Sequence, residues 1–144
     1  MSSIRRLPIE IETALLAYAE EGRRSWRAGD LAAAEASFLA AWRCIPEPQI
    51  DHDYAQSMAR GLVEFFRETH QIERAREWLG VLRASYKDPN NPSVTFLDAT
   101  VEFAAGNENI AFRSFEELHR AYGVRCFRGE NPAYLKFFRG YSKR

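Results

Sequence analysis

Side chains with catalytic or metal-binding chemistry are few and scattered in this chain of 144 residues. Its three histidines, His52, His70 and His119, form no H-E-x-x-H or comparable metal-binding pair. Cys126 stands beside Arg125, whose charge favours a thiolate, but no histidine shares this local motif. Phosphate-binding glycine loops and the G-x-S-x-G motif are also absent from the sequence. We therefore predict no catalytic residues, no metal site and no cofactor, and hence a protein that is not an enzyme.

Opposite charges are segregated along the chain, although its formal net charge is zero. Residues 45–119 hold seven basic and thirteen acidic groups, whereas residues 120–144 hold seven basic groups and one acidic group. Either the basic C-terminus packs on the acidic body of its own chain, or the two charged surfaces serve a partner. Aromatic residues interleaved with the basic ones also suit nucleic-acid binding. Two observations argue against nucleic-acid binding: the net charge of the chain is zero, and the aromatic residues have the spacing of a packed helix face.

Cysteine usage and hydropathy indicate a protein of the cytoplasm. The two cysteines, Cys44 and Cys126, form no C-x-x-C pair, so we expect reduced thiols rather than a disulfide framework. No apolar run is long enough for a membrane span, and residues 1–12 lack the apolar core of a signal peptide. We expect a cytoplasmic protein that does not contact a membrane.

Small and large residues in the first third of the chain are spaced as in a helical hairpin. Gly29 and Asp30 end one helix and cap the next. Ala34 is small enough to let two helices approach closely, and Phe38 and Ala41 share one face of the second helix. The pattern therefore predicts an antiparallel pair of helices.

The same spacing recurs twice further along the chain. The counterparts of Ala34, Phe38 and Ala41 are Ala75, Leu79 and Leu82 in a second copy, and Ala111, Phe115 and Leu118 in a third. No segment of useful length alternates apolar and polar residues as a strand does. We predict an all-α fold of about seven helices in a single domain over residues 1–144. Its parts are hairpins at about 11–45, 51–87 and 91–122 and a capping helix at about 132–141.

This pattern resembles the tetratricopeptide repeat over about residues 14–122. The resemblance is carried in the first hairpin by Gly22, Ala34, Phe38, Ala41 and Pro46, and it is weaker in the other two hairpins. Polar residues stand at four places where the family prefers large apolar ones; they are Glu21, Ser25, Asp98 and Glu102. The resemblance implies a short superhelical stack in which the first helix of each hairpin lines a concave, partner-binding groove.

The groove implied by this resemblance supplies the candidate binding residues. Chaperone-binding members of the family clamp a peptide carboxylate with Lys and Asn, but Ala19 and Arg23 hold those places here, so we do not expect that activity. Trp and Arg are frequent interface hot spots, whereas Trp26, Phe96 and Phe103 suit a helical core equally well. The predicted partner-binding residues are Arg23, Trp26, Arg27, Arg60, Glu64, Arg67, Glu68, Phe96, Thr100 and Phe103.

The C-terminal segment carries a second, shorter resemblance. Gly123–Phe127, Gly129–Pro132 and Tyr134–Phe137 resemble the end of small bacterial repeat proteins found beside polymorphic toxins, which are taken to be immunity proteins. We therefore expect a non-catalytic protein-binding module, first of all a bacterial immunity protein that binds and neutralises a cognate toxin. The alternative is a tetratricopeptide-like adaptor or chaperone-like scaffold for protein–protein interaction. Nucleic-acid binding through the basic C-terminus is a third and less favoured interpretation.

Overall fold

The computed structural model describes residues 4–141, which form seven α-helices and two short 3-10 helices. In chain order the elements are α1 (Ile9–Arg27), α2 (Leu31–Arg43), η1 (Gln49–Asp51), α3 (Ala55–Glu68), α4 (Ile72–Ser85), α5 (Pro92–Ala104), α6 (Glu108–Tyr122), η2 (Gly123–Phe127) and α7 (Pro132–Tyr141). The described chain contains no β-strand, so the predicted all-α class is confirmed. No helix within residues 4–141 combines the length and apolar character needed to cross a membrane.

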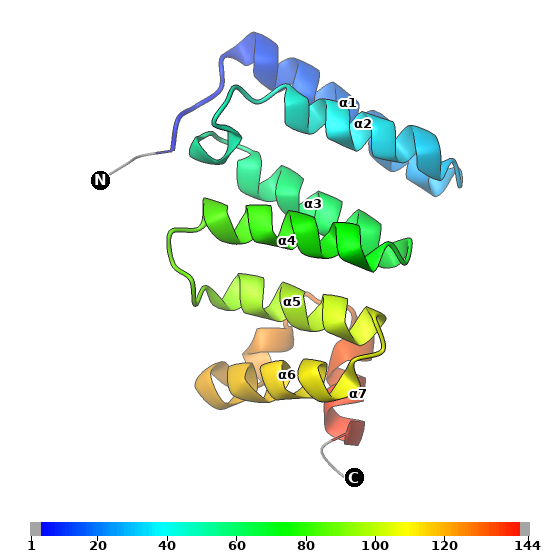
Figure 1. The fold of residues 1–144 in the computed structure, drawn as a ribbon, viewed down its shortest axis with the longest axis vertical. Helices are drawn as coiled ribbons and strands as arrows, with labels where there is room; N and C mark the ends of the chain where they lie inside the picture. Colours follow the sequence, from blue (N-terminus) through cyan, green and yellow to red (C-terminus); the bar gives the residue numbers. More distant parts are fainter. Residues whose placement is uncertain (1–3, 142–144) are drawn as a thin grey trace.

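The helices pair into three antiparallel hairpins, α1–α2, α3–α4 and α5–α6, which stack one upon another (Figure 1). Because α2 contacts α3 and α4 contacts α5, each hairpin packs on the next. The second hairpin begins at Ala55 rather than near residue 51. The reason is local, since Gln49–Asp51 forms a 3-10 turn and Tyr54 adopts a left-handed backbone with φ of 71°.

Glycine and capping residues end and begin the helices where their spacing in the sequence predicts. Gly29 has a φ of 83° and Gly106 a φ of 85°, both in the left-handed region that favours glycine. The Asp30 carboxylate accepts a hydrogen bond from the Ala33 amide at 3.1 Å, and the Asn91 side chain caps α5 in a similar way. The two glycine turns bring α2 back beside α1 and α6 back beside α5.

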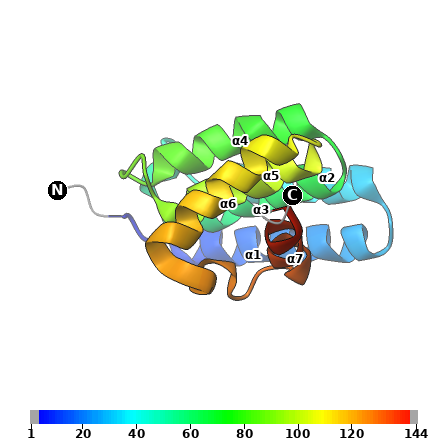
Figure 2. The same cartoon turned by 90° about the horizontal axis from the view of Figure 1, so that it is seen from below.

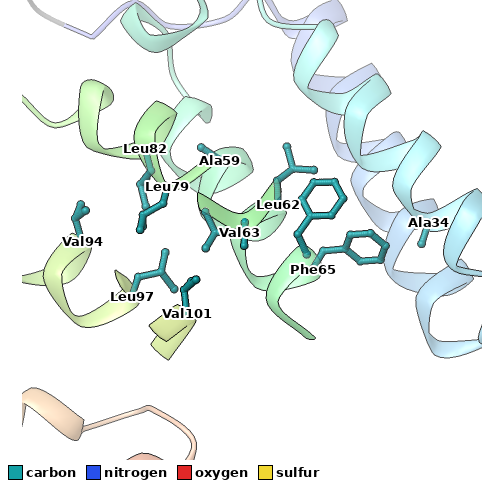
Figure 3. Packing of buried hydrophobic residues seen from close by; sticks show 12 residues of the cluster. Ala34, Ala59, Leu62, Val63, Phe65, Leu79, Leu82, Val94, Leu97 and Val101 are labelled. Atoms are coloured by element: carbon teal, nitrogen blue, oxygen red, sulfur yellow. The ribbon is translucent and has the colours of Figure 1, made fainter. Parts of the chain in front are cut away.

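Small residues let the paired helices approach, and apolar side chains fill the space between hairpins. Ala34, Ala75 and Ala111 are fully buried, as the repeated spacing predicts. A Cβ atom on Gly22 would lie 2.6 Å from Cε1 of Phe38, so the close approach of α1 and α2 requires glycine there. Figure 3 shows the central cluster, in which side chains from α2, α3, α4 and α5 form one apolar layer.

Two of the polar residues that depart from the repeat pattern join α5 to α4. Glu102 of α5 forms an ion pair with Arg76 of α4 at 3.1 Å. Asp98 forms another with Arg83, also at 3.1 Å. The contact between the second and third hairpins is therefore partly ionic, which accounts for carboxylates at positions where large apolar side chains were expected.

The last helix lies across the stack. Figure 1 shows α7 crossing the direction of the paired helices, and Figure 2 shows it on the side of α1, opposite α4. Phe137 packs on Phe103 of α5 with ring centroids 4.7 Å apart, and Phe138 stacks on Phe112 of α6 at 5.4 Å. The helix therefore covers aromatic side chains of the last hairpin, as expected of a capping helix.

Candidate functional site

The first helix of each hairpin, α1, α3 or α5, carries all ten predicted binding residues. We call the side of the stack on which these side chains lie the first-helix face. On this face the ten residues fall into four groups. Some line one of two pockets, some form a hydrogen-bonded network, and some belong to an aromatic layer that the C-terminal segment covers.

A pocket of about 180 Å³ lies between α1 and α3, and we call it the tryptophan pocket. Trp26 packs edge-on against Phe38 and Phe65, with ring centroids 6.1 and 5.1 Å away, and also lines this pocket. Space remains above α3 because Gly61 has no side chain, and a Cβ atom placed there meets no heavy atom within 4 Å. The lining residues are Ala19, Arg23, Trp26, Phe38, Ser57, Met58, Gly61 and Glu64.

Charged groups of both signs stand around the tryptophan pocket. Arg23 donates a hydrogen bond to Glu20 at 3.0 Å, and Arg27 lies 3.7 Å from the same carboxylate. The hydrogen bond from Arg23 lowers the pKa of Glu20 below its ordinary value. Glu64 adds a negative group from α3, and a second hollow is lined by Arg23, Trp26 and Arg27. The pocket thus combines aromatic walls with polar groups that can orient a partner.

The Arg67 side chain is tied into the fold. Its Nη1 donates to the Thr100 hydroxyl at 2.8 Å, while Nε and Nη2 donate to Glu68 at 3.1 and 2.8 Å. Its guanidinium carbon lies 6.0 Å from the ring centroid of Tyr134 in α7. The Arg67 side chain is only 12% exposed, and Thr100 is completely buried. Thr100 therefore cannot touch a partner in this structure, which corrects its assignment to the binding surface.

The aromatic residues of α5 lie beneath the C-terminal segment. Phe96 is 6% exposed, and its ring centroid lies 5.5 Å from that of Phe127 in η2. Phe103 is half-buried against Phe137 and Tyr134 of α7. Phe96 thus belongs to the core, and Phe103 is partly covered. The repeat pattern could not reveal this, because it describes contacts within hairpins and says nothing of where the chain after α6 folds back.

A larger pocket, of about 500 Å³, lies between α3, the start of α5, the end of α6 and η2, and we call it the arginine pocket. Arg60 comes from α3, whereas Arg125 and Arg128 come from η2 and the residue that follows it. The Arg60 guanidinium donates to the Ser93 carbonyl at 3.5 Å, a weak hydrogen bond. The lining residues are Arg60, Pro92, Ser93, Phe96, Leu118, Tyr122, Arg125, Cys126, Arg128 and Glu130.

Two titratable groups of the arginine pocket have perturbed acidity. Burial raises the pKa of the Cys126 thiol. The thiol is therefore protonated at neutral pH, in spite of its basic neighbours in the sequence. Burial also raises the pKa of Glu130, although the positive charges of Arg60 and Arg67 act in the opposite direction. The pocket accordingly holds a poor nucleophile, and its one acidic residue, Glu130, is exposed to solvent.

Sequence reasoning missed two features of this face. Arg60 and the basic C-terminal residues stand far apart in the chain and were treated as separate surfaces, yet Arg60, Arg125 and Arg128 line one pocket. No local pattern signals this, because the meeting depends on how η2 folds back. Gly61 was also missed, although a glycine inside an amphipathic helix is a signal for a close approach or an open space.

Among the residues that the structure describes, no three histidine, cysteine or acidic side chains gather closely enough to hold a metal ion. Comparisons of the chain with protein-family models, curated proteins and solved structures found no match. The geometry of the two pockets is therefore the basis on which the function is inferred.

Proposed function

We propose that this protein is a non-catalytic protein-binding module and that its partner docks over the tryptophan pocket. The supporting observation is the position of Trp26, which packs against the buried Phe65 and the partly buried Phe38 and also lines an open pocket. A rigid aromatic side chain at the edge of a pocket, with arginines beside it, has the composition of an interface hot spot. Arg23, Arg27 and Glu64 supply the polar groups around that anchor.

The partner that we propose is a cognate toxin, which the protein neutralises by binding, so that the protein acts as a bacterial immunity protein. The support is the resemblance of residues 123–137 to the ends of such proteins, together with the segregated charges of the chain. Charge on both surfaces accelerates association and selects one partner over others. A tetratricopeptide-like adaptor or scaffold is the alternative, because a stack of helical hairpins suits that role equally.

Three aromatic residues of the C-terminal segment argue against nucleic-acid binding there. Phe127, Tyr134 and Phe138 are 6%, 7% and 9% exposed, so their rings are packed into the protein. Stacking platforms for single-stranded nucleic acid need exposed ring faces. The aromatic residues of the C-terminal segment are therefore better explained as packing residues than as a nucleic-acid binding surface.

The replacement Gly61→Leu tests the proposed site. Leucine should fill the tryptophan pocket without a clash, because the space around the Gly61 Cβ position is open, and it should favour α3 by about 0.8 kcal/mol. The control is Gly80→Leu in α4. A Cβ atom on Gly80 also meets nothing within 4 Å, but Gly80 does not line the tryptophan pocket. We expect Gly61→Leu alone to weaken binding by about tenfold or more.

The measurement is co-expression with the product of the neighbouring gene, followed by a pull-down and a growth assay. If the neighbour binds and its toxicity is relieved by the parent protein and by Gly80→Leu but not by Gly61→Leu, the proposal stands. Equal protection by both variants would place the contact elsewhere on the molecule. If the product of the neighbouring gene neither binds this protein nor harms cells, the immunity function is rejected in favour of the adaptor function.

A further inference from the structure

We propose that the arginine pocket is the subsite for a carboxylate-bearing segment of the protein partner, an acidic stretch that also carries an apolar residue. This inference rests on the proposed protein-binding function and adds the chemistry of the partner. It starts from the meeting of Arg60 with Arg125 and Arg128, which belong to two distant parts of the chain.

The arginines of the arginine pocket outnumber its acidic groups, and within the described chain they form no ion pair. None of its three arginines lies within 4.0 Å of a carboxylate of residues 4–141, whereas Arg74, Arg76 and Arg83 on α4 all form ion pairs. Glu130 is the only acidic residue that lines the pocket. Arginine guanidinium groups bind carboxylates through two parallel hydrogen bonds. A pocket with three arginines and one acid therefore favours an anionic group.

Apolar surface beside the arginines specifies the rest of the ligand. Tyr122 lines the same pocket and is 44% exposed, whereas Phe96 and Leu118, which also line it, are each 6% exposed. Val124 of η2, which precedes Arg125 in the chain, is 49% exposed. An acidic residue followed by an apolar one can therefore pair its carboxylate with the guanidinium groups while its neighbour covers the aromatic wall.

Acidic side chains around the pocket select a short acidic segment over a long polyanion. Glu117 lines a hollow that shares Leu118 and Tyr122 with the arginine pocket, and Glu64 lies one turn of α3 away from Arg60. A continuous phosphate backbone would pass these carboxylates and be repelled. The separate side-chain carboxylates of a short peptide can enter between them, so we infer a protein segment rather than a nucleic acid.

The test uses the full chain and a peptide of sequence Glu-Glu-Leu-Glu-Glu that carries fluorescein on its N-terminus and an amide at its C-terminus, so that all peptide probes share the charge of the dye and differ only in their side chains. Binding is followed by fluorescence anisotropy at low ionic strength, with Gln-Gln-Leu-Gln-Gln and an oligothymidylate as comparison probes. We expect the acidic peptide to bind about tenfold or more tightly than the glutamine peptide. Added salt should weaken the binding.

Three variants locate the binding in the pocket. Arg128→Glu should weaken acidic-peptide binding by about tenfold. Arg113→Glu, the same charge change at an exposed residue of α6 that does not line the pocket, should have far less effect. Glu130→Gln removes the one acid of the pocket and should strengthen binding about two- to fivefold. Circular dichroism and thermal melting check that each variant is folded.

Equal effects of Arg128→Glu and Arg113→Glu would overturn the subsite, since the peptide would then respond only to overall charge. Tighter binding of oligothymidylate than of the acidic peptide would also overturn it and make the ligand a nucleic acid. These outcomes do not affect the Gly61→Leu experiment, because that experiment measures binding of the whole partner protein at the tryptophan pocket. Failure of the subsite and failure of the protein-binding function are therefore separate results.

Discussion

Single small residues set how closely the helices of this protein approach. Ala34 is fully buried where α2 meets the central cluster, and Gly22 leaves room for the Phe38 ring and nothing more. Protein interiors are packed as densely as organic crystals, so a side chain added at such a position has no space to enter. The spacing of small residues is therefore as informative about the fold as the spacing of large ones.

The replacement Ala34→Leu should lower the free energy of unfolding by about 1–3 kcal/mol, because it overpacks a filled site. Ala36→Leu is the matched control, since Ala36 lies on the same helix and is exposed; it should change stability by about 0.5 kcal/mol or less. Chemical denaturation followed by circular dichroism measures both. Equal stabilities of the two variants would show that Ala34 does not limit the helix packing.

At the scale of elements, ionic contacts join the second hairpin to its neighbours. Arg76 of α4 reaches Glu102 of α5, and Arg74 of α4 pairs with Glu35 of α2 at 2.7 Å. The Glu102 side chain is 13% exposed and also accepts a hydrogen bond from Asn107 at 2.7 Å. A carboxylate so placed is screened less by water than one on the surface, and an amide in its place would keep one acceptor oxygen and turn an NH2 group toward one of the two donors.

The replacement Glu102→Gln should therefore lower the free energy of unfolding by about 1–2 kcal/mol. Glu73→Gln provides a stringent control, because Glu73 pairs with the same Arg76 at 2.6 Å but is 81% exposed. A surface pair of that kind contributes about 0–1 kcal/mol, so this variant should remain close to the parent. Thermal or chemical denaturation distinguishes the two, and similar losses in both would mean that Arg76, not the α4–α5 contact, governs the effect.

The sequence predicts these elements better than it predicts their surfaces. Ala34, Ala75 and Ala111 locate the three hairpins, because helix pairing within a hairpin depends on residues close together in the chain. Thr100 was placed on the binding face and is buried, because α7 and η2 cover α5. Where a C-terminal segment docks depends on contacts between distant residues, such as Arg67 with Tyr134, and spacing along the chain does not encode them directly.

At the scale of the whole molecule, the apolar residues form three clusters along the stack. One gathers around Leu15 at the first hairpin, one fills the centre, and one is the aromatic cluster of the last hairpin with η2 and α7. In stacked helical repeats each unit contacts mainly its neighbours, so stability is approximately a sum of local terms. The two ends of this molecule should therefore open independently, and each pocket should respond most to the cluster beside it.

The replacement Phe138→Ala tests this arrangement from the C-terminal end. Phe138 is 9% exposed and its ring lies within 5.5 Å of those of Phe127, Phe112 and His119, so its loss should cost about 3–5 kcal/mol locally. Native-state hydrogen exchange should show the amides of α5 and α6 losing protection while those of α1 and α2 keep it. Leu15→Ala, a completely buried residue of the first cluster, should give the reverse pattern. A uniform loss of protection over all helices in either variant would show instead that the stack opens as one cooperative unit, and damage at one end would then reach both pockets together.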